Sequence, residues 1–112
     1  YRIGIHGTYK IGLNEVAIGM TLPYFGIELA RERLAATHLA SAVTLAKLYD
    51  SVAAVEAGFL DEVVSEEDLM AQAIDTAEAF AALDKAAFKN TKARTREALL
   101  DRLAKAIEKE LG

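Results

Sequence analysis

The sequence predicts an α/β fold with strands near the start of the chain and helices over the rest, and three observations lead to this prediction. Residues 2–5 and 8–13 alternate between apolar and small or polar side chains, which is the period-two pattern of half-buried strands. Farther along the chain, apolar residues recur at spacings of three and four, as in amphipathic helices. Hydrophobic residues make up 53% of the 112 residues, which is enough for the core of one domain.

The two N-terminal strands are predicted to form a hairpin whose turn is His6-Gly7, because glycine accepts the positive φ of tight turns. A single hairpin is only marginally stable in water. The chain offers one more short strand candidate, residues 59–64 (FLDEVV). The hairpin therefore needs a larger sheet, and we expect the chain to be the C-terminal part of a longer protein whose sheet lies upstream.

Capping signals divide the rest of the chain into helices. Ser, Thr and Asp side chains accept hydrogen bonds at helix starts, proline suits a first turn, and glycine suits a helix end. The predicted helices are residues 24–34 after Pro23, a helix from the N-cap Thr37 through Tyr49, residues 52–57 between Ser51 and Gly58, a helix from a Ser65–Asp68 capping box to about residue 82, and a last helical region from the cap Asp84 to Leu111 with a break near Thr95.

Two of these helices carry apolar stripes at helical spacing. A stripe in the last helix could be ordinary core, a contact between copies of the protein, or the interface of a helical interaction module. The stripes are Leu69, Ala73, Ala77 and Phe80 in the first helix, and Leu99, Leu103, Ile107 and Leu111 in the second.

Composition excludes several classes of protein. A net charge of −4 and a pI of about 5.2 argue against nucleic-acid binding, which favours basic chains. The absence of cysteine excludes disulfides and thiolate metal sites, and His6 and His38 lack partners at ligand spacing. No apolar run approaches the roughly 20 residues that span a bilayer, so we expect no membrane partner. No signal peptide is visible, and the composition is compatible with a cytoplasmic protein.

Glu15 is the main candidate for chemistry, because it is the only carboxylate between Tyr1 and Phe25. Burial raises the pKa of a carboxyl group, and a raised pKa suits a general base or acid near neutral pH. The structural alternative is that Glu15 ends a strand and lies at the positive end of the following helical turn. The residues by themselves favour this alternative.

A second candidate is the basic face formed by Lys85, Lys89 and Lys92, near Arg94 and Arg96. In an acidic chain, a local positive face could receive phosphate groups. An ordinary solvated helix surface explains the same pattern equally well.

Taken together, three stretches resemble the crotonase superfamily of enoyl-CoA hydratases and isomerases. Residues 12–15 (GLNE), followed by Ile18-Gly19 and Leu22-Pro23, resemble the second active-site segment of that family. Residues 51–64 (SVAAVEAGFLDEVV) resemble the family's small helix that ends at glycine and leads into an apolar-Asp-x-Val-Val strand, and Thr91-Lys92 is a weaker match. The resemblance covers essentially the whole chain and reverses the preference against Glu15.

The resemblance implies a fold and partners. Residues 1–64 would be the end of the family's spiral of ββα units, and residues 65–112 a helical trimerisation region. The expected partners are an acyl-CoA substrate, further copies in a trimer or dimer of trimers, and the upstream half of the same subunit. No cofactor is implied, since coenzyme A enters as the substrate thioester. The pathway implied is fatty-acid β-oxidation.

The resemblance also implies a mechanism. Two backbone N–H groups would stabilise an enolate at the thioester oxygen, and in this family both lie upstream of Tyr1. Glu15 would move the proton. Pro23, Tyr24 and Phe25 would form an apolar acyl wall, and Lys92 would meet the phosphate region of coenzyme A.

The type of reaction stays open at this level. Hydratases of the family usually have proline before this glutamate, whereas Asn14 stands here, and a Gly-rich loop is replaced by Leu22-Pro23-Tyr24-Phe25-Gly26. At both positions the sequence is more similar to the mitochondrial type of Δ3,Δ2-enoyl-CoA isomerase. The alternatives are a non-catalytic member that binds acyl-CoA and a helical interaction module without chemistry.

Overall fold

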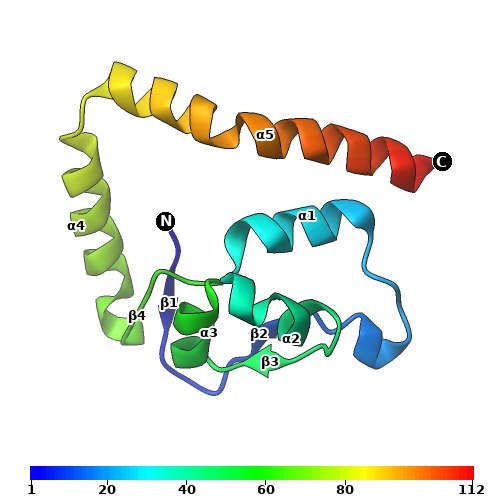
Figure 1. Ribbon diagram of the computed structural model, residues 1–112. Helices are drawn as coiled ribbons and strands as arrows, with labels where there is room; N and C mark the ends of the chain where they lie inside the picture. Colours follow the sequence, from blue (N-terminus) through cyan, green and yellow to red (C-terminus); the bar gives the residue numbers. More distant parts are fainter.

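The strands of the protein form two short two-stranded sheets, and the helices cover them and extend beyond them. The computed structural model describes residues 1–112. Strand β1 (Ile3–Ile5) runs parallel to β4 (Glu62–Val64), and β2 (Ile11–Gly12) runs antiparallel to β3 (Leu48–Tyr49). β1 therefore pairs with a strand from the middle of the chain (Figure 1).

The predicted hairpin of the first two strands is wrong. The backbone N–H of His6 donates to the carbonyl of Val64 at 3.0 Å, so the predicted turn extends the contact between β1 and β4. Only Ile11 and Gly12 of the second predicted strand are in a sheet. Alternation shows which side chains share a face, but it does not show which strand is the neighbour.

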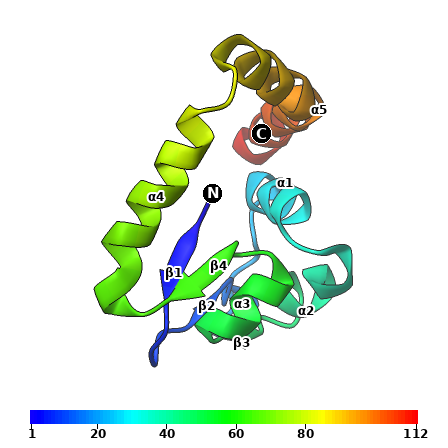
Figure 2. The ribbon, with the colours of Figure 1, turned by 90° about the vertical axis from the view of Figure 1, so that its left-hand side faces the viewer.

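Helices make up most of the chain, and they fall into a body and an extension. The body contains α1, α2, α3 and both sheets, α4 leads away from it, and α5 returns above α1 (Figures 1 and 2). In chain order the helices are η1 (Val16–Ile18), α1 (Tyr24–Arg33), η2 (Ala36–His38), α2 (Leu39–Val43), α3 (Ser51–Ala57), η3 (Glu66–Asp68), α4 (Leu69–Ala81) and α5 (Lys85–Leu111).

The core of the body is small and consists mainly of alanines, which allow α1, α2 and α3 to approach one another closely. Its largest member is Tyr49, which is 1% exposed and packs its ring 5.6 Å from that of Phe59. The Tyr49 hydroxyl lies 3.4 Å from Nδ1 of His38, so its polar end has a partner. The buried members of the core are Ala30, Leu34, Ala42, Tyr49, Ala54 and Ala57.

The helix predicted from Thr37 through Tyr49 is wrong in its second half. α2 ends at Val43, and Ala46 has φ = 53°, which reverses the chain. Leu48 and Tyr49 then pair with β2 as strand β3. Burial of Tyr49 and pairing with β2 override the helical spacing, as tertiary context often does. Thr37 lies inside η2 and makes no capping bond.

The other predicted caps have mixed outcomes. Asp84 caps α5 as predicted, since its Oδ2 accepts the N–H of Ala87 at 2.8 Å. The prediction that Ser51 caps α3 is wrong, because the cap is Asp50, whose Oδ1 accepts the N–H of Ala53 at 2.7 Å.

The Ser65 hydroxyl donates to the carboxylate of Asp68 at 2.8 Å instead of capping the backbone, so the predicted box is not formed. The break near Thr95 is also absent, and the Thr95 hydroxyl donates to the carbonyl of Lys92 at 2.9 Å within a continuous helix.

The two long helices bury less apolar surface than their stripes suggest. In α4, Leu69 and Ala73 are half-buried, but Ala77 and Phe80 are exposed, because the second half of the helix stands away from the body (Figure 2). In α5, Leu99 is buried against the body, whereas Ile107 and Leu111 are exposed. None of the helices has both the length and the apolar character needed to cross a membrane.

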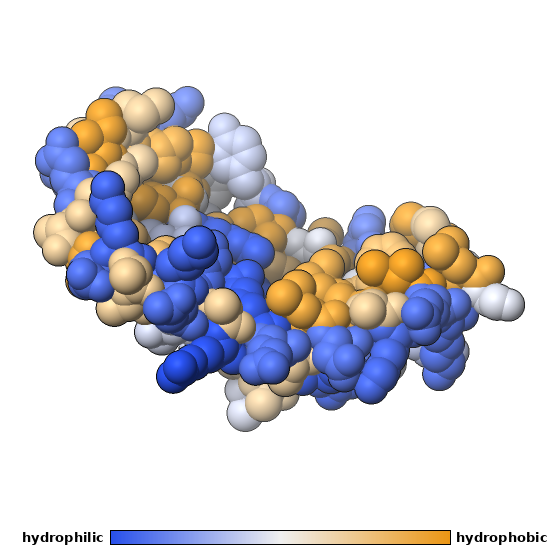
Figure 3. Space-filling view, turned by 90° about the horizontal axis from the view of Figure 1, so that it is seen from above, coloured by the Kyte–Doolittle hydropathy of each residue, from blue (hydrophilic) through white to orange (hydrophobic).

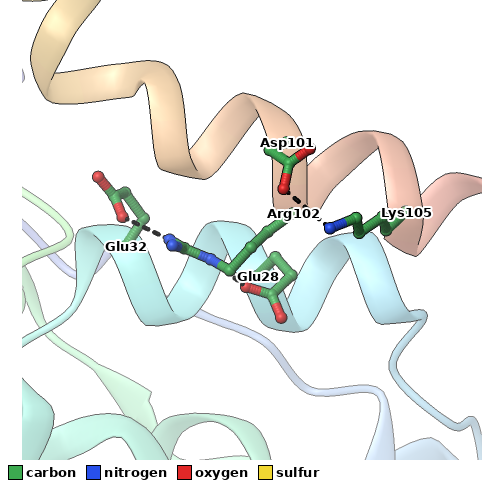
Figure 4. Close-up of polar contacts among 5 residues, drawn as sticks. All are labelled: Glu28, Glu32, Asp101, Arg102 and Lys105. Carbon is green, nitrogen blue, oxygen red and sulfur yellow. Dashed lines mark hydrogen bonds and ion pairs between the residues drawn. The ribbon is translucent and has the colours of Figure 1, made fainter.

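Contacts between α5 and α1 are polar as well as apolar. Arg102 of α5 bridges two carboxylates one turn apart on α1: its Nε lies 3.0 Å from Glu28, and its Nη2 lies 3.1 Å from Glu32 (Figure 4). Lys105 instead pairs with Asp101 along α5 itself, at 3.0 Å. The bridge fixes the register of α5 along α1.

Candidate functional site

Glu15 lies directly after the sheet formed by β2 and β3, at the start of η1. Its backbone carbonyl accepts the N–H of Ile18 at 3.1 Å and that of Met20 at 2.8 Å. The turn therefore fixes the backbone of Glu15 from its C-terminal side, and β2 fixes it from the other side.

The carboxylate of Glu15 is half-buried, and its Oε2 is buried without a hydrogen-bond partner in the protein. The side chain makes no capping bond to the N–H groups of η1. Glu15 occupies the N-cap position of η1, as the structural alternative expects, but no hydrogen bond ties its carboxylate to that turn. An unpaired buried oxygen is unfavourable for folding, by about 1–3 kcal/mol for such groups. The protein itself therefore provides no hydrogen-bond partner for this oxygen.

The chain next to Glu15 is held by a close approach of two backbones. A Cβ atom on Gly12 would lie 2.9 Å from the carbonyl oxygen of Lys47 and 2.7 Å from a methyl group of Leu48. Only glycine permits this spacing of β2 and β3, which explains why glycine stands in the segment that precedes Glu15.

An apolar cleft of about 200 Å³ opens beside this segment, between Leu13, α1 and the loop before β4. The sequence reasoning missed it, since its members are far apart along the chain. The lining includes Leu13, Gly26, Leu29, Ala30, Arg33 and Phe59.

The three predicted wall residues lie at the start of α1. Pro23 has extended backbone geometry at the N-cap, and α1 begins at Tyr24, as the sequence predicts. The rings of Tyr24 and Phe25 are partly exposed. Tyr24 is engaged by α5, since its N–H donates to Oε2 of Glu110 at 2.7 Å and Nζ of Lys109 lies 4.2 Å from its ring centroid.

Lys92 does not join Glu15 within this chain. It lies in the N-terminal part of α5 and lines a hollow of about 550 Å³ together with Tyr1, Thr91 and Arg96. That part of α5 and the η1 turn are at opposite sides of the molecule in Figure 1. The roles of Glu15, of the Pro23–Phe25 wall and of Lys92 therefore stay predictions.

Asp61 joins three segments of the body, which the sequence reasoning missed. Its Oδ2 accepts from Nη2 of Arg33 at 2.8 Å and from the backbone N–H of Arg2 at 2.8 Å. The hydrogen bond from Arg33 is the main cause that holds the pKa of Asp61 below its ordinary value, and the backbone bond from Arg2 adds to it. In the sequence, Asp61 is one of five acidic residues between positions 61 and 68, and nothing local distinguishes it from the other four.

We expect Asp61→Asn to lower the free energy of unfolding by about 1–2 kcal/mol at neutral pH, since the ion pair is partly exposed. A depressed folded-state pKa means that the stabilisation is complete above the unfolded value of about 4 and is lost as the pH falls through the folded value. Urea denaturation should therefore show the difference between the two proteins shrinking below about pH 4. Asp75→Asn, on the exposed face of α4, is the matched control, and an equal loss there would contradict the assignment.

The histidines and carboxylates give no metal site. No group of three or more His, Asp or Glu side chains is gathered closely enough to hold a metal ion. His38 contacts the Tyr49 hydroxyl, and His6 is exposed after β1.

The exposed surface of α5 is apolar along one side of the helix and hydrophilic along the other. Seen from above, its C-terminal part shows apolar side chains along one edge and hydrophilic side chains along the other (Figure 3). The exposed apolar residues there include Leu100, Ile107 and Leu111.

Comparisons with known proteins identify the origin of these motifs. The sequence model of the family described as enoyl-CoA hydratase/isomerase matches residues 5–112. No curated protein matches the chain. The crystal structure of an enoyl-CoA hydratase/isomerase family protein from Pseudomonas syringae is 47% identical, with a TM-score of 0.95, and the match covers 97% of this chain and 47% of that one.

Two further structures extend the comparison. An enoyl-CoA hydratase from Mycobacterium marinum is 35% identical, with a TM-score of 0.88, over 96% of this chain and 48% of that one. Human mitochondrial Δ3-Δ2-enoyl-CoA isomerase is 28% identical, with a TM-score of 0.88, over 98% of this chain and 43% of that one.

The chain thus spans about half the length of the structures that it matches. Over that half, its elements superimpose on theirs, which confirms the crotonase-like α/β fold. The resemblance stated from residues 12–15 and 51–64 is confirmed as well. The chain belongs to the enoyl-CoA hydratase/isomerase family.

Proposed function

We propose that the protein is an enzyme that moves a proton on an enoyl-CoA thioester, with Glu15 as the catalytic acid/base. The observation that carries this proposal is the half-buried carboxylate of Glu15, whose Oε2 has no partner in the protein and which does not cap η1. A carboxylate that is not used by the fold can accept a proton from a bound substrate. Family membership supplies the substrate class.

The chemistry follows from the acidity of the thioester. Removing a proton from C2 of an acyl-CoA places negative charge on the thioester oxygen, where N–H donors can stabilise it. In an isomerase, the Glu15 carboxylate takes the C2 proton of a 3-enoyl-CoA and returns it at C4, so the double bond moves to C2. In a hydratase, water adds its hydroxyl at C3 and a proton at C2. Asn14 and the Pro23–Phe25 wall favour the isomerase.

Assays of the full-length protein with crotonyl-CoA and with a 3-enoyl-CoA test this proposal. Conversion of the 3-enoyl ester to the 2-enoyl ester identifies an isomerase, and hydration of crotonyl-CoA identifies a hydratase. Binding of both esters without turnover indicates the non-catalytic member instead. If neither ester binds, the helical interaction module becomes the better description.

Lys92→Ala is expected to raise the Michaelis constant for acyl-CoA about fivefold while kcat changes little, as for a group that binds ground state and transition state equally. Steady-state kinetics with one ester at varied concentration measures both constants. Lys85→Ala is the matched control, since Lys85 belongs to the same basic face but does not line the hollow around Lys92. An unchanged Michaelis constant in Lys92→Ala would remove Lys92 from the binding site.

We further propose that residues 65–112 take part in forming a trimer or a dimer of trimers. The exposed apolar edge of α5, which includes Leu100, Ile107 and Leu111, supports this, because such a patch is typical of an interaction surface. Mass measurement by light scattering gives the oligomeric state. The cytoplasmic location and the role in fatty-acid β-oxidation stay predictions.

A further inference from the structure

The first turn of α1 is capped from a distant part of the chain. The first N–H groups of any helix lack intrahelical partners. Pro23, at the N-cap, provides no side-chain acceptor. Instead, the carboxylate of Glu110, 86 residues farther along, accepts the N–H of Tyr24 at 2.7 Å. A carboxylate at this end of a helix is also favoured by the helix dipole.

The adjacent residue of α5 holds the side chain of Tyr24. Nζ of Lys109 lies 4.2 Å from the centroid of the Tyr24 ring, within the range of a cation–π contact. Two consecutive residues of α5 therefore contact the backbone and the ring of one residue of α1.

α5 is itself anchored, so that its last turn cannot slide freely along α1. Arg102 binds Glu28 and Glu32 at 3.0 and 3.1 Å, two turns before Lys109 and Glu110 (Figure 4). Leu99 and Ala106 of α5 are buried. A cleft of about 280 Å³ between the helices is lined by Tyr24, Glu28, Arg102, Lys105, Ala106 and Lys109.

We propose that Lys109 and Glu110 are positioning residues, which hold the first turn of α1 and thereby set the acyl chain length that the enzyme accepts. This inference rests on the proposed function, in which Tyr24 and Phe25 form part of the acyl wall. Lys109 and Glu110 act through Tyr24 and do not touch the substrate.

In the proposed site, the wall formed by Pro23, Tyr24 and Phe25 meets the far part of a long acyl chain, and a short chain close to Glu15 ends before it. A displaced first turn of α1 would then affect long chains more than short ones. Loss of Glu110 should therefore change the ratio of kcat/KM for a long and a short enoyl-CoA. A purely structural role would instead lower the melting temperature and affect both esters alike.

The test compares Glu110→Ala with Glu110→Gln and Glu108→Ala in the full-length protein. Glu108→Ala is the matched control, because Glu108 lies in the same turn and its side chain makes no hydrogen bond or ion pair. The measurements are kcat/KM for a four-carbon and a ten-carbon enoyl ester, the melting temperature, and amide hydrogen exchange of the peptide that contains Tyr24.

We expect Glu110→Ala to shift the ratio of kcat/KM about fivefold, as a small displacement near a substrate-positioning group does. Amide exchange at the start of α1 should rise in the same variant. Glu110→Gln keeps an oxygen that can accept the Tyr24 N–H, so its ratio should stay within about twofold of the unmodified protein. Glu108→Ala should change neither quantity.

An unchanged ratio in an active Glu110→Ala protein overturns this inference and leaves the proposed function intact. An equal shift in Glu108→Ala also overturns it. If the unmodified protein converts neither ester, the proposed function fails, and the chain-length role fails with it. Amide exchange still shows in that case whether Glu110 holds α1.

Discussion

Replacing Glu15 by glutamine is expected to lower kcat by about 10³-fold for crotonyl-CoA and for a 3-enoyl-CoA, because proton transfer by a positioned group contributes about 10²–10⁴-fold. Glutamine has nearly the same shape but neither takes nor gives a proton at the working pH. Binding of the esters should remain largely unchanged. Steady-state kinetics measures the first effect, and calorimetric titration with a non-reacting acyl-CoA measures the second.

The stability of the same variant separates a functional carboxylate from a structural one. Oε2 of Glu15 is buried without a partner, so removing the charge relieves an unfavourable burial. We expect the melting temperature of Glu15→Gln to equal or exceed that of the unmodified protein. Glu56→Gln, at an exposed position of α3, is the control and should retain full activity. Full activity of Glu15→Gln with both esters would exclude Glu15 as the acid/base.

The sequence was most informative where a residue type has a single local meaning. Asp84 begins α5 because its carboxylate accepts a backbone N–H, and Pro23 precedes α1 because its φ suits that position. Gly58 ends α3 because glycine readily adopts the left-handed backbone of a helix C-cap. Such signals depend only on neighbours within one turn, so they can be recognised without the fold.

Long-range pairing could not be predicted from local patterns. β1 pairs with a strand 59 residues farther along, between Ile3 and Glu62, and nothing in the alternation of residues 2–5 selects that partner. The short strand at Leu48 and Tyr49 was hidden because the apolar spacing before it suits a helix. It forms because β2 offers an edge and Tyr49 is buried.

The candidate site shows the same division. Glu15 stood out because it is an isolated acid in an apolar stretch, and the fold leaves its carboxylate unused. The contacts that hold Tyr24 come from Lys109 and Glu110, which in the sequence are two charges on an ordinary helix surface. Their meaning depends on how α5 lies across α1, which no local pattern contains.

Replacing Gly58 by alanine is expected to lower the free energy of unfolding by about 3 kcal/mol or more, through backbone strain and steric overlap together. Gly58 has φ = 102°, which L-residues rarely adopt. A Cβ atom there would lie 2.8 Å from the carbonyl oxygen of Arg33 and 3.2 Å from the amide nitrogen of Ala35. Both atoms belong to the backbone at the C-terminal end of α1, so they cannot move aside without distorting the chain there.

Gly19→Ala is the matched control, because Gly19 also has a positive φ, 78°, but its Cβ would meet nothing within 4 Å. Strain by itself should cost about 1 kcal/mol there. Urea denaturation of both variants separates the two effects, and equal losses would show that the contact with Arg33 is unimportant.

The N–H of Ala35 donates to the carbonyl of Ala57 at 2.9 Å, so the end of α3 is joined directly to the end of α1. The glycine in residues 51–64 is therefore needed for the junction that aligns α1 with β4, and α1 in turn carries the proposed acyl wall.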